Sequence, residues 1–255
     1  MKKILLLVSA LLMIIVGSGC DNSEKETQKT GVTILVGAAA SLTDVLNELE
    51  PVFEKETGID LDLQYGSSGT LKEQIKNGAP IDVFFSAAKK DMDELVAAGL
   101  IADDQILLNN QLVLVKSKSS KVKSLDDLSS VQYIAVGDPA SVPVGKYTKE
   151  ALQNLGMLET LNGKFTYGKD ASQVLSWIEL GNAEAGFVYY SDYVRSEGKV
   201  DLVEKIDASK YSKIVYPIGV VKNSQKQEEA KKFIEFLNSD KAKAEFEKWG
   251  FSLAQ

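Results

Sequence analysis

Hydrophobic and polar positions follow two alternating periodicities after residue 31, which predicts a chain of alternating strands and helices. Residues 32–37 form a continuous apolar, β-branched run of the buried-strand type. The next segment places apolar residues from Leu42 to Phe53 at spacings near 3.6, and Gly58 is expected to end that helix. The same alternation then predicts strands over 59–65 and 81–86 and helices over 68–77 and 89–98.

The second half of the chain continues the pattern. Strands are predicted over 111–116, 131–137, 185–190 and 213–221, and helices over 145–155, 171–180, 226–237 and 241–249. The strand–helix order of the first half implies parallel strands with helices on both faces. One sheet holding all these strands would be large for a single domain. We therefore expect an α/β protein of two doubly wound lobes with a cleft between them, since such sheets bind ligands beyond the carboxyl ends of their strands.

The first twenty residues have the pattern of a processing segment. Lys2 and Lys3 precede a largely apolar run over 4–16, and small residues lead to Cys20. The run is short for a membrane span, which needs about 20 apolar residues. We predict a signal peptide at 1–19, and the ending resembles a bacterial lipobox with Gly17 where leucine is usual. Cys20 would then be lipidated, residues 20–31 would form a flexible tether, and the protein would be secreted and anchored to the outer face of the cytoplasmic membrane, or periplasmic.

Composition removes several classes of function. The net charge is −7, with Lys+Arg 29 and Asp+Glu 36, and Arg195 is the single arginine, so nucleic acid is a poor partner. The chain has no histidine, which excludes Ser-His-Asp, Cys-His and His-zinc sites. A serine nucleophile would need a base within hydrogen-bond reach, and histidine is absent to supply one. We therefore expect a binding protein, not an enzyme.

Two predicted helices of the first half begin after turns of small residues. The turn at 37–44 places Ser41 at a helix N-cap, and the turn at 65–75 places Ser67 and Ser68 at another. A helix start offers unpaired N–H groups and partial positive charge, which together can hold an anion.

Two helices of the second half begin in the same way. One opens at Val144 or Gly145, and the other opens near Ala171 with Asp170 or Ser172 as its cap. A single such start is usually only a structural cap, but four starts at corresponding ends of two lobes can converge on one cleft. Neutral N–H and O–H donors suit a fully deprotonated tetrahedral dianion, and they disfavour a protonated phosphate because its O–H would find no acceptor.

Five segments together resemble the molybdate-binding proteins of bacterial ABC importers. They are AAASL (38–42), YGSSGTLKEQI (65–75), GAPIDVFFSA (78–87), VGDPASVPVGKYTKEAL (136–152) and FVYYSD (187–192), in the family's order and spacing. The resemblance implies a type II periplasmic-binding-protein fold with two hinged lobes. We place the first lobe at 32–112 and 217–255 and the second at 113–216.

The resemblance also implies a ligand and a set of binding residues. Ser41 and Ser68 would each donate a hydroxyl and a backbone N–H to a molybdate or tungstate oxyanion. Val144 and Ala171 would donate backbone N–H groups, and Tyr189 its phenolic O–H, with Tyr190 taking that role if the register differs by one. The metal would have no direct protein ligand, and no cofactor is implied. The expected partner is an ABC permease, and the expected state is a monomer. Another tetrahedral oxyanion such as sulfate is the alternative ligand.

Overall fold

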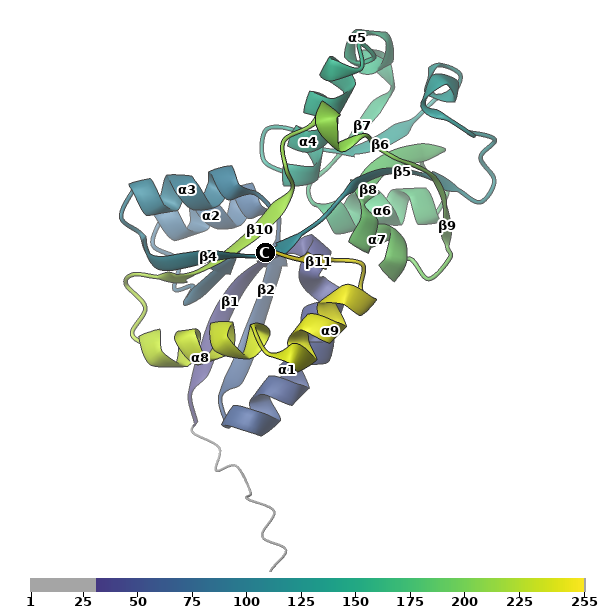
Figure 1. Cartoon of the computed structure of the whole chain (residues 1–255). Helices are drawn as coiled ribbons and strands as arrows, with labels where there is room; N and C mark the ends of the chain where they lie inside the picture. The colour runs from purple at the N-terminus through teal and green to yellow at the C-terminus, as the bar shows by residue number, and fades with distance from the viewer. Residues whose placement is uncertain (1–30, 255) are drawn as a thin grey trace, which may run out of the picture.

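The computed structural model describes residues 31–254, so the predicted signal peptide, Cys20 and residues 20–30 of the predicted tether lie outside the described residues. The described chain forms two mixed β-sheets, each flanked by helices, and Figure 1 shows them as two separate bodies. We call them the first lobe (purple, blue and yellow) and the second lobe (teal and green). The chain crosses from the first lobe to the second after residue 109 and returns to the first lobe before residue 215.

The first lobe is built on a six-stranded sheet. Its strand order is β11 (Ser252–Leu253), β4 (Ile101–Asn109), β10 (Val215–Val221), β3 (Val83–Phe85), β1 (Thr33–Ala39) and β2 (Asp60–Gly66). Its helices are α1 (Thr43–Thr57), α2 (Ser68–Lys76), α3 (Lys89–Ala97), α8 (Gln227–Leu237) and α9 (Asp240–Lys248), with a 3₁₀ turn, η1 (Ala40–Leu42), before α1.

The second lobe is built on a five-stranded sheet. Its strand order is β7 (Phe165–Gly168), β6 (Ile134–Gly137), β8 (Ala185–Tyr189), β5 (Leu112–Ser117) and β9 (Val200–Lys205). Its helices are α4 (Pro143–Asn154), α5 (Leu158–Leu161), α6 (Ala171–Glu179) and α7 (Tyr190–Arg195), with 3₁₀ turns η2 (Leu125–Ser129), η3 (Asn162–Lys164) and η4 (Ala208–Lys210).

The strand directions differ in part from the parallel arrangement that the sequence predicts. Strands β1, β2 and β3 are parallel, as are β6, β7 and β8. Strand β10 runs antiparallel to β3 and β4, and β5 runs antiparallel to β8 and β9. Both β5 and β10 follow a crossing between the lobes. A strand–helix–strand connection brings the chain back to the same end of the sheet and gives parallel strands, whereas these crossings deliver the chain to the other end and give antiparallel ones. The fold class is as predicted, and the sheets are mixed.

Several elements have no counterpart in the sequence prediction. Strands β4, β7, β9 and β11 and the short helices α5 and α7 fall in segments without a clear period. In β4 the stretch 102–106 is exposed and includes Asp103 and Asp104, so the strand lacks the apolar alternation on which the prediction depends. Tertiary pairing with β10 forms that strand, not local propensity.

The predicted helix boundaries hold where capping residues were available. Gly58 takes the left-handed conformation with φ 72° and donates its N–H to the Glu54 carbonyl, so it ends α1 as expected. The buried face of α1 consists of Val45, Leu46, Leu49 and Phe53, which are the apolar positions spaced near 3.6. This helix packs against the sheet of the first lobe within the main hydrophobic core.

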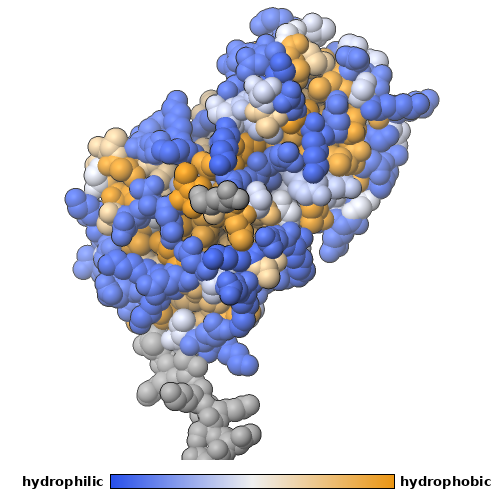
Figure 2. Space-filling model, in the orientation of Figure 1, coloured by the Kyte–Doolittle hydropathy of each residue, from blue (hydrophilic) through white to orange (hydrophobic). Residues whose placement is uncertain are grey.

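The surface is mainly polar. In Figure 2 hydrophilic residues cover most of the face shown on both lobes, with hydrophobic residues gathered in smaller patches between them. Within residues 31–254, every helix is too short or too polar to cross a bilayer.

Candidate functional site

One small, narrow pocket lies where the two lobes face each other. It is lined by the ends of several strands and the first turns of the helices that follow. The five residues that the resemblance implies all line it: Ser41, Ser68, Val144, Ala171 and Tyr189. Every residue of the lining is uncharged. The structure therefore brings residues spread over nearly 150 positions of sequence to one place.

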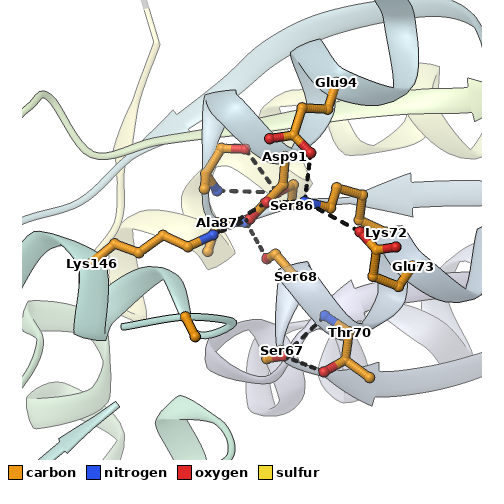
Figure 3. Close-up of polar contacts among 12 residues, drawn as sticks. Ser67, Ser68, Thr70, Lys72, Glu73, Ser86, Ala87, Asp91, Glu94 and Lys146 are labelled. Atoms are coloured by element: carbon orange, nitrogen blue, oxygen red, sulfur yellow. Dashed lines mark hydrogen bonds and ion pairs between the residues drawn. The ribbon is translucent and has the colours of Figure 1, made fainter. Parts of the chain in front are cut away.

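Ser68 lies at the start of α2, where Figure 3 shows its hydroxyl directed at the backbone of Ala87. Its Oγ accepts a hydrogen bond from the Ala87 N–H at 2.9 Å, and the side chain is fully buried. The preceding Ser67 is the N-cap, and its Oγ accepts from the Thr70 N–H. Because the Ser68 oxygen already accepts from Ala87, the Ser68 hydroxyl proton is free to point into the pocket.

Ser41 lies in a different backbone setting from the one predicted. It was expected at a helix N-cap, but it is the middle residue of the 3₁₀ turn η1, and Leu42 holds the N-cap position of α1 without a side-chain bond. The strand β1 runs directly into this turn, whose N-cap is the last residue of the strand, Ala39, which has no polar side chain to cap with. The Ser41 Oγ instead lies 2.9 Å from the Tyr216 Oη.

The helix starts of the second lobe supply backbone donors. Val142 is the N-cap of α4 and Pro143 its first residue, so the helix begins just before the predicted Val144 or Gly145. Asp170 caps α6 by accepting from the Gln173 N–H at 2.8 Å, which settles the predicted choice between Asp170 and Ser172. First-turn N–H groups have no acceptor within their helix, so those of Val144 and Ala171 are available to a ligand.

Tyr189 is the last residue of β8, and its hydroxyl is the clearest sign of a ligand. The side chain is 1% exposed, and among residues 31–254 its Oη is a buried oxygen with no hydrogen-bond partner. Burial, with a smaller contribution from Tyr216, raises its pKa well above 10, so the hydroxyl keeps its proton. An unpaired buried hydroxyl is costly unless a ligand accepts its proton. Tyr190 instead lies under the Lys205 ammonium, 4.2 Å from the ring centre.

A buried ion pair between Asp192 and Arg195, which lies outside the pocket lining, holds the backbone of Tyr189. The Asp192 carboxylate accepts from the Tyr189 N–H at 3.0 Å and from the Arg195 Nε at 3.0 Å. Asp192 is fully buried, and this burial raises its pKa while Arg195 opposes the shift. The single arginine of the chain therefore neutralises a carboxylate behind the pocket and does not line it.

Four contacts join the lobes around the pocket. The Gly69 N–H donates to the Ser141 carbonyl at 3.2 Å, and the Ser172 hydroxyl donates to the Ala40 carbonyl at 3.1 Å. Two ion pairs flank them, at 3.3 Å between Arg195 and Asp44 and at 3.2 Å between Lys146 and Asp91. The lobes are therefore closed over the pocket.

The Lys146 contact is part of a larger charged cluster. Figure 3 shows Lys146 extending from α4 to Asp91 on α3, where Lys72 and Glu94 complete the group. The Asp91 side chain is 1% exposed and lies 3.1 Å from Lys72, so it is paired within its own lobe as well as across the cleft. The sequence offered no signal for this pairing, because Asp91 and Lys146 lie on separate, amphipathic helices.

The geometry defines a closed, neutral, donor-rich pocket between two lobes, which is the site of a solute-binding protein for a small anion. The chain matches the family of bacterial extracellular solute-binding proteins over residues 34–252 and belongs to that family.

Curated relatives and solved structures agree with this assignment. The chain is 42% identical over 257 residues to YvgL of Bacillus subtilis (strain 168), covering 98% of each chain, and the name of that relative assigns it to ABC transporter substrate-binding lipoproteins. It is 38% identical to the molybdate-binding protein ModA of Escherichia coli (strain K12), covering 86% of this chain and 89% of ModA. The structure of the periplasmic molybdate-binding protein of Azotobacter vinelandii aligns with a TM-score of 0.79 at 26% identity, covering 87% of this chain and 100% of the other.

Proposed function

We propose that this chain captures molybdate, and also tungstate, in the pocket between its lobes and delivers the oxyanion to an ABC permease. The observation that carries the proposal is the unpaired, buried Tyr189 hydroxyl facing a pocket with an uncharged lining. Relatives named as molybdate-binding proteins support the choice of oxyanion. The same donors could hold another tetrahedral dianion, and sulfate is the alternative.

The proposed binding mode uses donors from both lobes. Ser41 and Ser68 would donate hydroxyl and N–H groups from the first lobe, and Val144, Ala171 and Tyr189 would donate from the second. Hydrogen bonds to a charged acceptor contribute about 1.5–3 kcal/mol each, and helix N-termini add about 0.3–1 kcal/mol each. Since the ligand bridges both lobes, it stabilises the closed form over an open one. The anion would be cargo, and we propose neither a cofactor nor a catalytic role.

The sequence analysis places 32–112 and 217–255 in the first lobe and 113–216 in the second, and we propose these boundaries with small shifts, since Leu112 begins β5 of the second lobe and Tyr216 lies in β10 of the first. The chain passes from β4 to β5 and from β9 to β10 between the two sheets. We propose that these two connections are the hinge. The remaining proposals are a monomer, a signal peptide ending at residue 19 and lipidation of Cys20, which the lipoprotein name of a relative supports.

Calorimetric titration tests the proposed function. The chain lacking residues 1–20 is titrated separately with molybdate, tungstate, sulfate and phosphate at one ionic strength. We expect one-to-one binding of molybdate and tungstate, with sulfate at least about a hundredfold weaker, a difference of about 2.7 kcal/mol. Equal sulfate affinity would move the function to another oxyanion importer, and no heat with any anion would contradict an oxyanion site.

Removal of either serine hydroxyl is expected to weaken molybdate binding. Ser41→Ala and Ser68→Ala should each lose about 1.5–3 kcal/mol, because each deletes one donor to a charged ligand. Ser68→Ala should also lower the free energy of unfolding by about 1–3 kcal/mol, since the buried Ala87 N–H loses its acceptor. Calorimetry and urea unfolding measure the two effects, with Ser129→Ala on an exposed turn as the control. Unchanged affinity in both variants would remove these residues from the site.

Loss of the ion pair across the cleft should affect binding more than folding. In Lys146→Met the contact with Asp91 disappears, while Asp91 keeps Lys72 as its partner. We expect molybdate affinity to fall by about 1 kcal/mol, roughly fivefold, because the pair is only partly exposed. Lys149→Met, an exposed lysine on the same helix, is the matched control. Equal losses in the two variants would indicate a general effect of charge and not a contact between lobes.

A further inference from the structure

A chain of hydrogen bonds leads from the connection between the lobes to Ser41. The Asn110 Nδ2 donates to the Tyr216 Oη at 3.2 Å, and the Tyr216 Oη lies 2.9 Å from the Ser41 Oγ. Tyr216 lies on β10 and is fully buried, and Ser41 is 3% exposed. None of the sequence motifs pointed to Asn110 or Tyr216, because each reads as an ordinary residue at a strand end.

The orientation of the Asn110 amide is fixed by its neighbours. Its Oδ1 accepts from the Gln111 N–H at 2.8 Å and faces the Ser191 N–H at 3.5 Å. Its Nδ2 donates to the Ser191 Oγ at 2.8 Å as well as to Tyr216. The reversed amide would set its NH₂ group against two backbone N–H donors, so the side chain presents a donor to Tyr216.

The direction of the remaining bonds follows. Within residues 31–254, the Tyr216 hydroxyl has two hydrogen-bond partners, Asn110 and Ser41. Since Asn110 is a donor, the Ser41 Oγ is the acceptor that the described part of the chain offers to the Tyr216 proton. The reverse arrangement, with Ser41 donating to Tyr216, would leave a fully buried O–H without an acceptor. Burial, together with the nearby Asp192, raises the pKa of Tyr216 well above 10, so the phenol retains the proton that it donates.

We propose that Asn110 and Tyr216 form a relay that directs the Ser41 hydroxyl proton into the pocket, so that Ser41 accepts from Tyr216 and acts as a donor toward the ligand. The relay rests on the proposed function, since it acts on the selectivity of that site. Asn110 and Tyr216 are positioning residues, as neither lines the pocket. Ser68 receives the same polarity from the backbone N–H of Ala87. The direction of the hydroxyl proton is thus set by side chains at Ser41 and by a backbone N–H at Ser68.

The relay determines which oxyanions the site accepts. Molybdate at neutral pH carries only acceptor oxygens and fits a ring of donors. Hydrogen phosphate carries the same charge of −2 and one O–H that needs an acceptor. With the relay intact, both serine hydroxyls turn their protons toward the ligand, so the O–H of hydrogen phosphate faces donors. Because the two anions carry the same charge, the ratio of molybdate to phosphate affinity reports the polarity of the site and is insensitive to an added charge.

The test measures this ratio at about pH 8, where inorganic phosphate is mainly the hydrogen-phosphate dianion. In Tyr216→Phe the Ser41 hydroxyl is free to rotate, and we expect the ratio to fall about tenfold. In Asn110→Asp the carboxylate accepts the Tyr216 proton, Tyr216 accepts from Ser41, and the Ser41 lone pair faces the anion. We expect the ratio to fall at least about a hundredfold.

A double variant separates polarity from charge. In Asn110→Asp combined with Tyr216→Phe the relay is interrupted, so the ratio should match that of Tyr216→Phe alone. Tyr211→Phe is the matched control, because it deletes a buried hydroxyl that accepts from the Leu112 N–H and has no bond to Ser41. Its ratio should equal that of the unaltered protein. A ratio unchanged in Tyr216→Phe and Asn110→Asp, or an Asn110→Asp effect that persists without the Tyr216 hydroxyl, would overturn the relay.

A second measurement is independent of any ligand. In the unaltered protein, nuclear magnetic resonance should show the slowly exchanging Tyr216 hydroxyl proton with a nuclear Overhauser contact to the Ser41 β protons. If the unaltered protein binds none of the anions, the proposed function fails, and this contact still decides the direction of the bond. A Tyr216 proton directed away from Ser41 would overturn the relay even if molybdate binds tightly.

Discussion

Gly69→Ala is expected to weaken molybdate binding by about two orders of magnitude and to leave the ligand-free fold intact. A Cβ at Gly69 would lie 2.3 Å from the Ser141 carbonyl oxygen of the facing lobe. Real Cβ atoms do not approach an oxygen so closely, so with alanine at this position the lobes could close only to a wider separation. The Gly69 N–H also donates to that carbonyl at 3.2 Å, and this bond would be lost with the contact.

The magnitude follows from packing. Overfilling a close-packed contact costs about 1–3 kcal/mol, and the lost hydrogen bond adds about 1 kcal/mol. A total near 2.7 kcal/mol corresponds to about a hundredfold loss of affinity. If the proposed hinge opens in the ligand-free protein, the added methyl meets solvent there. Alanine also favours the helix α2 over glycine by up to about 1 kcal/mol. The variant should therefore unfold at the same or a higher denaturant concentration than the unaltered protein.

Calorimetry with molybdate and urea unfolding without it measure the two halves of this result. Gly163→Ala is the control, because a Cβ there meets nothing within 4 Å. Affinity within twofold of the unaltered protein would mean that the lobes do not meet at Gly69 in the bound state. Loss of affinity together with loss of stability would indicate a folding defect and would contradict a role confined to closure.

Arg195→Met is expected to produce the largest loss of stability, about 3–5 kcal/mol near pH 7. Arg195 is the partner of the fully buried Asp192, and its removal leaves an uncompensated charge behind the pocket. The substitution also removes the contact with Asp44 across the cleft, so the closed form loses a further interaction. Urea unfolding measures the loss, and Lys118→Met, which breaks an exposed ion pair with Asp201, should lose no more than about 1 kcal/mol.

The loss in Arg195→Met should shrink as the pH falls. Burial already raises the pKa of Asp192 in the folded protein, and removal of the guanidinium raises it further. A carboxyl with a raised folded-state pKa binds its proton more tightly folded than unfolded, so its penalty is full above the raised pKa and disappears below the ordinary one. The difference in unfolding free energy between the variant and the unaltered protein should therefore be smaller at about pH 5 than at about pH 7. A pH-independent difference would assign the effect to lost packing and not to the buried charge.

The sequence by itself determined the fold class and most of the helices, and its family resemblance pointed to five of the residues that line the pocket. Apolar spacing in 42–53 and Gly58 defined α1, because buried faces and left-handed helix ends depend on local residue types. The motifs around Ser41, Ser68, Val144, Ala171 and Tyr189 were recognisable because each is a short, contiguous strand–turn–helix segment. The absence of histidine argued against histidine-dependent catalytic and zinc sites, and the acidic composition argued against nucleic-acid binding, before any geometry was known.

Only the tertiary structure decided which groups face one another. Strand β4 forms by pairing with β10 despite its acidic, exposed stretch, and the chain crossings reverse β5 and β10 within their sheets. The ion pair of Lys146 with Asp91, the contact of Gly69 with Ser141 and the bond of Tyr216 to Ser41 each join residues more than fifty positions apart. Local sequence fixes the donors that a segment can offer, whereas the direction of a hydroxyl proton and the closure of a cleft depend on partners that only folding brings within bonding distance.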